Sequence, residues 1–291
     1  THKARVFVNG TEVASHVGGF LPFNAHVNDV VKYNEYNKLS VLVNNELSET
    51  MIPCGQTSVL SNGKKVSAPY FDFYNYSGLQ RPVKLLCLPK ENITDFAVNH
   101  RLVGADAEVD YTVETTGDHD AVVEVYDAEG NKVAEACGKT GTVVVKDAKL
   151  WNVHASYLYK FVVKIVDGDT VIDEYYDMIG IRTFEVKGGH FLLNGKPVYL
   201  KGFGKHEDSD IRGRGLDMVT VKRDFELMKW IGSNCFRTSH YPYAEEVYYM
   251  ADEEGFLIID ETPAVGLMES TMNFLAANQG TGKKVTFFEK E

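Results

Sequence analysis

The first 89 residues alternate between hydrophobic and polar positions with the period of two that is typical of β-strands. Val6 and Val8 follow this alternation, and Asn9-Gly10 supplies a hairpin turn before the pattern resumes at Glu12-Val13. No stripe of apolar residues at helical spacing occurs in this region. We therefore predict an all-β domain over residues 1–89. The other strands predicted there are residues 39–43 and 82–88.

Short apolar runs continue through residues 90–185, with turn residues between them. Glu129-Gly130-Asn131 and Asp167-Gly168-Asp169 are two of these turn signals. About seven short strands in about 95 residues are typical of an immunoglobulin-like β-sandwich. The cysteine pair of antibody domains is missing, so the number of strands alone supports this prediction. The predicted strands are residues 96–98, 108–113, 121–126, 132–136, 141–146, 157–166 and 171–176.

A helical period replaces the strand pattern after about residue 186. The first predicted helix is capped by Asp217 or Thr220 and ends before Gly232. The second covers residues 243–254 and ends at Gly255. Predicted strands are residues 191–192 and 198–200, joined by a turn at Asn194-Gly195, and residues 234–237 and 256–259. The apolar residues expected inside are Val221, Phe225, Met228 and Ile231 in the first helix and Ala244, Val247, Tyr248 and Ala251 in the second.

Strands and helices therefore alternate in the last third, as they do at the start of a parallel α/β domain. A (β/α)8 barrel needs about 250 residues. Only about 105 residues remain after residue 186, which is room for three strands. We interpret residues 186–291 as the first part of a TIM barrel rather than as a small, unusual α/β domain.

Composition and charge argue against several classes of partner and of site. The formal net charge is −11, and no run of Lys or Arg exceeds two residues, which argues against a nucleic-acid partner. No segment approaches the roughly 18 unbroken apolar residues of a membrane span. The four cysteines contain no C-x-x-C pair, so we expect reduced thiols in a cytoplasmic protein rather than disulfides or a zinc site. Thr1 begins directly on a strand pattern, so we expect the natural N-terminus, with any signal peptide, to lie upstream.

Three polar clusters follow three successive strands of the α/β region. They are residues 202–210, residues 237–241 and Asp260-Glu261. Functional side chains of a barrel gather where its strands end. We therefore expect the clusters to surround one mouth. The candidate site residues they supply are His206, Asp208, Arg237, His240, Tyr241, Asp260 and Glu261.

Each cluster also has a purely structural interpretation. His206-Glu207-Asp208 could ligate a metal, but the spacing of a zinc protease needs a second histidine where Asp210 stands, so we expect no metal. His240 could be a hydrogen-bonded core histidine. Arg237 could be a buried ion-pair partner of Asp260 or Glu261, which is compatible with support of a rigid site.

The aromatic run at residues 70–76 contains one carboxylate, Asp72. It could consist of core aromatics with an exposed aspartate. It could equally be an apolar platform that stacks on a sugar face while Asp72 holds a pair of hydroxyl groups.

Together these segments resemble glycoside hydrolase family 2. Residues 234–259 resemble the barrel signature of the family over about 26 residues without a gap. Residues 202–215 resemble the glucuronidase version of the preceding motif, since galactosidases generally have Asn where Gly204 stands. Three further segments look glucuronidase-like: residues 43–47, 71–78 and 259–266.

The resemblance implies a multidomain fold of a jelly-roll β-sandwich, an immunoglobulin-like β-sandwich and the first part of a (β/α)8 TIM barrel. The expected boundaries are 1–89, 90–185 and 186–291. It also implies retaining hydrolysis of terminal β-D-glucuronides, in which one carboxylic acid protonates the leaving oxygen and a carboxylate about 5 Å away attacks the anomeric carbon. No cofactor is implied.

The resemblance assigns roles to few residues of this chain. It implies that Asp72 contacts the sugar and that His206 forms a wall of the glucuronate site. The other candidates would support the site. The family's acid lies in an Asn-Glu pair, and its nucleophile is a later Glu. Neither motif follows Glu261, so we expect no catalytic residue within the chain and an inactive fragment.

Residues 267–290 match the place of a long loop near the active-site mouth of many gut-bacterial glucuronidases, where an apolar aglycone or a neighbouring subunit could bind. A surface loop is the alternative. The loop residues concerned are Met268, Met272, Phe274 and Leu275.

We expect the full-length bacterial enzyme to be a homo-oligomer, either a dimer or a tetramer. Two other functions remain alternatives. One is a family-2 enzyme of other specificity, β-galactosidase-like, and the other is a non-catalytic carbohydrate-binding or scaffold protein.

Overall fold

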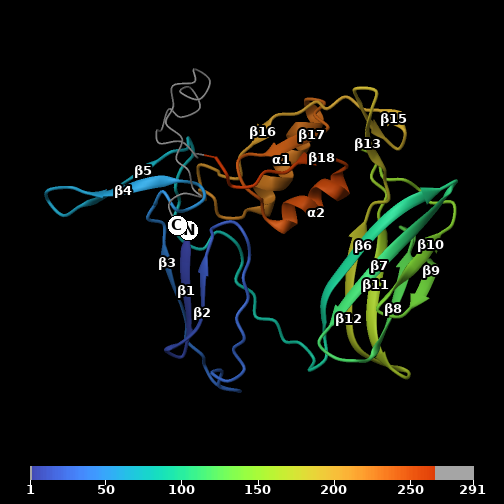
Figure 1. The fold of residues 1–291 in the computed structure, drawn as a ribbon, viewed down its shortest axis with the longest axis horizontal. Helices are drawn as coiled ribbons and strands as arrows, with labels where there is room; N and C mark the ends of the chain where they lie inside the picture. The colour runs from blue at the N-terminus through green and yellow to red at the C-terminus, as the bar shows by residue number, and fades with distance from the viewer. Residues whose placement is uncertain (1, 266–291) are drawn as a thin grey trace.

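The computed structural model describes residues 2–265, so the predicted mouth loop at residues 267–290 lies outside the described residues. The described chain has three parts (Figure 1). An amino-terminal β part, residues 2–89, and a β-sandwich, residues 90–182, lie on opposite sides of an α/β part, residues 183–265. Neither helix described within residues 2–265 is long and apolar enough to cross a membrane.

The amino-terminal part contains a three-stranded antiparallel sheet in the order β2-β1-β3 and a separate hairpin of β4 and β5. The turn predicted at Asn9-Gly10 is confirmed, with positive φ values of 52° and 89°. Two successive positive φ angles are what a type I′ hairpin turn requires. The strands are β1 (Lys3–Val8), β2 (Thr11–Val17), β3 (Leu39–Asn44), β4 (Gly55–Val59) and β5 (Lys65–Pro69).

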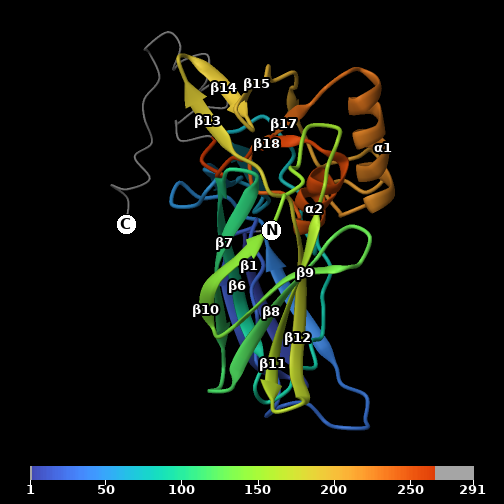
Figure 2. The same cartoon turned by 90° about the vertical axis from the view of Figure 1, so that its right-hand side faces the viewer.

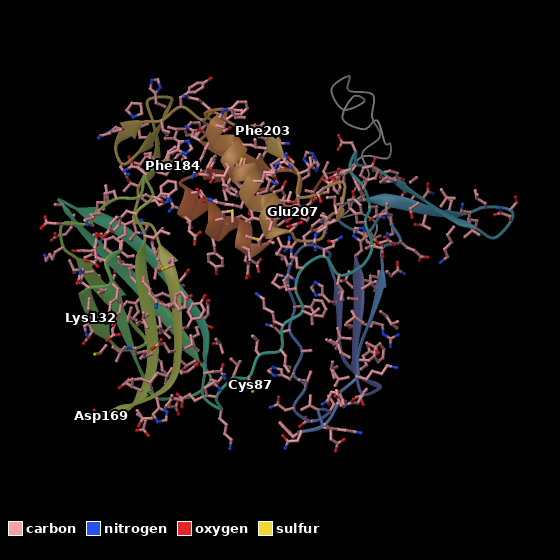
Figure 3. The ribbon with its side chains drawn as sticks, turned by 180° about the vertical axis from the view of Figure 1, so that it is seen from behind. Cys87, Lys132, Asp169, Phe184, Phe203 and Glu207 are labelled. Atoms are coloured by element: carbon pink, nitrogen blue, oxygen red, sulfur yellow. The ribbon has the colours of Figure 1, made fainter. Side chains whose placement is uncertain are left out.

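The prediction of a strand at residues 82–88 is wrong. This segment forms an extended connection from the amino-terminal part to the sandwich, and Figure 3 shows Cys87 on it. No strand within residues 2–265 pairs with its backbone, so it lacks the ladder hydrogen bonds that define a strand. The apolar character that suggested a strand stays exposed at Val83, Leu85, Leu86 and Leu88.

The sandwich has the predicted seven strands, arranged as one sheet in the order β10-β7-β6 and another in the order β12-β11-β8-β9 (Figure 2). Alternate residues point inward, as a half-buried strand requires, so Val109, Val123 and Phe161 are fully buried between the sheets. The strands are β6 (Ile93–Val103), β7 (Asp106–Thr115), β8 (Asp120–Tyr126), β9 (Lys132–Cys137), β10 (Thr140–Val145), β11 (Tyr159–Asp167) and β12 (Thr170–Ile179).

The α/β part contains three parallel strands in the order β16-β17-β18, with two helices in the connections. Phe225 packs edge-on against Phe236 and Phe256, so one aromatic side chain joins α1 to β17 and to the residue that precedes β18. Asp217 caps α1, as predicted, by accepting from the amides of Val219 and Thr220. The elements are β13 (Phe184–Lys187), β14 (His190–Leu193), β15 (Lys196–Pro197), β16 (Gly204–Lys205), α1 (Met218–Trp230), β17 (Cys235–Thr238), α2 (Glu245–Glu254) and β18 (Leu257–Ile259).

Two predictions for the α/β part are wrong. Ile231 is 59% exposed, because it is the C-cap of α1 and its φ and ψ of −82° and 0° take the chain off the helical path. Residues 198–200 form no strand. The chain comes alongside β17 only from Lys201, whose carbonyl accepts from the Asn234 amide at 2.9 Å, and the first parallel strand is β16.

The sandwich docks on the end of α2. Trp151 is fully buried there, and its indole donates to the Asp252 carbonyl at 2.8 Å. Arg182 stacks on the same ring at 4.6 Å and pairs with the Asp252 carboxylate at 3.3 Å. Gly255 ends the helix with a φ of 74°, and a side chain there would collide with the backbone of His154. This interface holds the α/β part from the side opposite the amino-terminal part.

Candidate functional site

The three polar clusters meet at one edge of the parallel sheet. Because β16, β17 and β18 are parallel neighbours, their carboxyl ends deliver His206, His240 and Glu261 to the same place. The two imidazole rings lie 5.5 Å apart in an edge-on arrangement. His240 Nδ1 is 3.1 Å from Glu261 Oε2.

The aromatic run of the amino-terminal part reaches the same edge. Phe73 packs against both histidines, with ring centroids 6.1 Å from His206 and 5.9 Å from His240. Asp72 is 60% exposed, and its Oδ1 lies 4.0 Å from His240 Nε2. Phe73 is therefore the packed member of the run, whereas Asp72 projects over the mouth with its carboxylate accessible to a ligand.

His240 lies between two carboxylates, one from the amino-terminal part and one from the α/β part. Nε2 faces Asp72, and Nδ1 faces Glu261. Arg237 Nε is 2.6 Å from the other oxygen of Glu261, although this ion pair lacks the alignment of a hydrogen bond. Arg237 is thus the ion-pair partner of Glu261, and the pair holds the carboxylate that orients His240.

Asp260 ties β18 to its neighbours. Its Oδ1 accepts from the Thr238 hydroxyl at 2.7 Å and from Tyr248 at 2.8 Å. Burial first, and then the bond to Asp260, raises the pKa of Tyr248 to about 12. The Thr238 hydroxyl also accepts from the Glu261 amide at 2.9 Å. These bonds fix the backbone from which Glu261 projects, so Asp260 acts on the site through the strand ends.

His206 forms a side of the mouth, and its imidazole is favoured in the neutral form. Burial lowers the pKa of this imidazole below its ordinary value of 6.5, although the Asp208 carboxylate opposes the shift. His206 Nδ1 and Asp208 Oδ1 lie 4.0 Å apart. Tyr76, from the amino-terminal part, donates to the other oxygen of Asp208 at 3.3 Å. A neutral imidazole offers one donor and one acceptor, which suits hydroxyl groups.

Glu207 and Tyr241 turn away from the mouth. Figure 3 shows Glu207 where the α/β part meets the amino-terminal part. Burial raises the pKa of Glu207, and the guanidinium groups of Arg81 and Arg214 oppose the shift. Tyr241 is buried, with Phe20 stacked on its ring at 4.5 Å. Both residues belong to the packing beneath the site.

Sequence reasoning missed several members of this arrangement. Thr238 belongs to the predicted cluster at residues 237–241, but its residue type is common in strands and did not mark it as a member of the site. Tyr76 belonged to the aromatic run, where nothing indicated a partner about 130 positions away. Arg81 and Arg214 carried no pattern that set them apart from surface arginines. All four act across long sequence separations, which periodicity does not reveal.

The mouth is suited to a polyhydroxyl ligand, because its carboxylates accept and its histidines both donate and accept hydrogen bonds. Within residues 2–265 it does not present the free carboxylate pair of a retaining glycosidase. Glu261 is engaged by Arg237 and His240, and Glu207 is buried. Nor do the described residues place three or more His, Cys, Asp or Glu side chains to hold a metal ion.

Known proteins resemble the chain over most of its length. A protein of Paenibacillus borealis named β-glucuronidase is 43% identical over 272 residues, which covers 91% of this chain and 46% of the relative. The human protein of that name is 38% identical over 283 residues, with 91% and 44% covered. The chain thus spans about half the length of the curated relatives it matches.

A solved structure also resembles the chain in its backbone fold. The crystal structure of Ruminococcus gnavus β-glucuronidase in complex with uronic isofagomine superposes with a TM-score of 0.95 at 56% identity, covering 99% of this chain and 48% of that one. The sequence profile of glycosyl hydrolases family 2 matches residues 91–182, and the profile of the TIM barrel domain of that family matches residues 184–285. The chain belongs to glycosyl hydrolases family 2.

Proposed function

We propose that the whole protein hydrolyses terminal β-D-glucuronides with retention of configuration and that this chain supplies the mouth that holds the sugar. The observation that carries the proposal is the convergence of Asp72, His206 and His240 from two parts of the chain at the ends of parallel strands. Relatives named β-glucuronidase, and a neighbour solved with D-glucuronic acid, support this sugar.

In this proposal Asp72 accepts hydrogen bonds from sugar hydroxyl groups, and His206 forms a wall beside the glucuronate. His240 aligns Asp72 through its 4.0 Å contact and is itself held by Glu261. The remaining predicted site residues support these groups. They are Asp208, Arg237, Tyr241 and Asp260.

The acid and the nucleophile of the whole enzyme lie outside residues 1–291 in this proposal. A retaining glycosidase needs two carboxyl groups about 5 Å apart, one to protonate the leaving oxygen and one to attack the anomeric carbon. Glu261 is committed to Arg237 and His240. No cofactor takes part in the proposed reaction.

We also propose the finer architecture: a partial jelly-roll domain at 1–89, an immunoglobulin-like domain at 90–185 and the amino-terminal part of a TIM barrel at 186–291. The two-sheet arrangement of β6 to β12 and the parallel order β16-β17-β18 support the last two. A homo-oligomer and a bacterial cytoplasmic location stay predictions.

Sugar specificity tests the proposal. A version of the chain extended to the length of its relatives is assayed with nitrophenyl β-D-glucuronide, β-D-galactoside and β-D-glucoside. We expect hydrolysis of the glucuronide alone, and Asp72→Asn should raise KM about tenfold or more, because a neutral amide replaces the charged carboxylate and one of its two acceptor oxygens becomes a donor. Preference for the galactoside would establish the other family-2 specificity, and binding without hydrolysis of any of them would indicate a non-catalytic role.

A further inference from the structure

Arg81 links the amino-terminal part to the loop that follows His240. Its Nη1 donates to the Phe20 carbonyl, and its Nη2 donates to the Pro242 carbonyl, each at 2.7 Å. Pro242 is two residues from His240 along the chain. One planar guanidinium therefore spans a carbonyl of each part and fixes their separation.

Arg214 makes the reverse connection. It lies between β16 and α1 with 8% exposure, and its Nη2 donates to the Gly19 carbonyl at 3.3 Å and to the side-chain oxygen of Gln80. Its guanidinium stacks at 4.6 Å on Phe20 of the amino-terminal part and at 4.6 Å on Tyr241 of the α/β part. The two parts thus exchange arginines across one buried seam.

Glu207 is the carboxylate on which the charges of both arginines act. Its Oε1 is 3.9 Å from Arg81 Nη2, and its side chain is 11% exposed. The same oxygen accepts from the Ala244 amide at the start of α2, at 3.1 Å. Glu207 also stands between His206 and Asp208 in the chain, so its anchoring sets the backbone of both mouth residues.

Stability alone does not account for this charge cluster. Burial raises the pKa of Glu207 and lowers the pKa of Arg214, so desolvation opposes the charged form of both groups. A buried ion pair whose desolvation opposes its own charges contributes little to folding compared with apolar packing of the same volume. What the cluster does supply is direction, because each guanidinium has fixed donor geometry.

The seam directly underlies Asp72. Phe73, the next residue, packs on Tyr241 with ring centroids 5.4 Å apart, while Phe20 stacks on the same ring at 4.5 Å. Tyr241 is thus packed against both aromatic side chains, and Arg214 stacks on it as well. A shift of the amino-terminal part along this seam would move Asp72 relative to His240.

We propose that Arg81, Arg214 and Glu207 are positioning residues for substrate recognition. They hold the amino-terminal part in register on the strand ends, so that Asp72 meets the sugar beside His206 and His240. This inference rests on the proposed function for its kinetic readout, and it extends that function to residues that touch no substrate.

The experiment is a double-mutant cycle in the protein extended to full length, with aryl β-D-glucuronide as substrate. Arg81→Met retains the aliphatic stem and removes both carbonyl contacts. We expect it to raise KM by about fivefold to tenfold with kcat changed less than about twofold, because binding rather than chemistry is affected. In an Asp72→Asn background the same substitution should change KM by less than about twofold, because the group it positions is already lost.

Arg182→Met is the matched control, since Arg182 also joins two parts of the chain, by stacking on Trp151 and pairing with Asp252. It should lower thermal stability and leave KM unchanged. Arg81→Lys retains the charge but loses the planar fork that reaches both carbonyls, so it should restore part of the lost affinity and provides a folded variant if Arg81→Met does not fold. Equal KM effects of Arg81→Met in both backgrounds, or no KM effect, would overturn the proposal.

Amide hydrogen exchange of the same proteins separates the two proposals. Arg81→Met should accelerate exchange in residues 71–76, whereas Arg182→Met should not. If the unmodified protein hydrolyses no glucuronide, the proposed function fails while the exchange result still tests the positioning role. Unchanged exchange in residues 71–76 contradicts that role whatever the activity.

Discussion

At the residue scale, most of the charged and imidazole groups around the mouth are held by a partner. His240 contacts a carboxylate on each side, and Arg237 holds one of those carboxylates. Asp72 and His206 remain accessible and hydrogen-bond competent. A ligand would therefore meet one exposed carboxylate and a neutral imidazole, which favours recognition of hydroxyl groups.

Titration of His206 tests its environment. Burial favours the neutral imidazole, so its pKa in the folded protein lies below the ordinary value of 6.5. Above that value the ring is neutral in the folded and unfolded states alike, and on acidification the unfolded chain takes up the proton first. We expect the His206 ring signal in NMR, assigned by its loss in His206→Gln, to titrate with a midpoint below that of an exposed histidine. A midpoint at or above 6.5 would show that the Asp208 carboxylate dominates.

The sequence predicted the meeting of the polar clusters better than it predicted the contacts beneath them. Clusters at strand ends have a local signature, and the structure brings His206, His240 and Glu261 together at one edge of the sheet. The seam of Arg81 and Arg214 joins positions far apart in the chain, and each arginine looks like a surface residue in its own segment. Such contacts depend on how two parts dock, which hydrophobic periodicity does not encode.

At the scale of elements, periodicity predicted both helices and most of the paired strands, but it missed the paired hairpin of β4 and β5, whose residues are mostly exposed and show no hydrophobic alternation. The sandwich strands were predicted from apolar runs between turn residues, and strands such as β7 bury alternate residues, which gives the alternation that defines a strand. Residues 82–88 have the same apolar character without a neighbouring strand within residues 2–265. The prediction that Ile231 is buried at the end of α1 is wrong for a related reason. Ile231 continues the apolar spacing, yet its backbone has already left the helix.

The glycines that end the two helices differ in what surrounds them. Gly232 and Gly255 have φ values of 77° and 74°, so alanine at either position costs about 1–2 kcal/mol for the left-handed backbone. A side chain on Gly232 would meet no atom within 4 Å, whereas one on Gly255 would approach His154 N to 2.4 Å. We expect Gly255→Ala to lower the free energy of unfolding by about 1–3 kcal/mol more than Gly232→Ala does.

Urea unfolding followed by tryptophan fluorescence provides this comparison. The chain has two tryptophans, and Trp151 is fully buried where the sandwich meets α2, so its emission reports on that interface. Equal losses for the two glycine variants would mean that the sandwich does not press on the end of α2.

At the scale of the whole molecule, three parts cooperate to form one edge. The α/β part supplies the strand ends, the amino-terminal part supplies Asp72, and the sandwich holds the far end of α2. This division explains why the mouth is defined in a chain that spans about half the length of its relatives. Among residues 2–265 the Glu261 carboxylate is held by Arg237 and His240, which agrees with the proposal that the acid and the nucleophile are other residues.

The most direct test of the account compares the chain of residues 1–291 with a version extended to the length of its relatives, both assayed for hydrolysis of nitrophenyl β-D-glucuronide. We predict hydrolysis by the extended protein and none above background by the shorter chain, because the proposal places the acid and the nucleophile outside the shorter chain. Hydrolysis by the shorter chain would contradict the account and would place the catalytic carboxylates among residues such as Glu207 and Glu261.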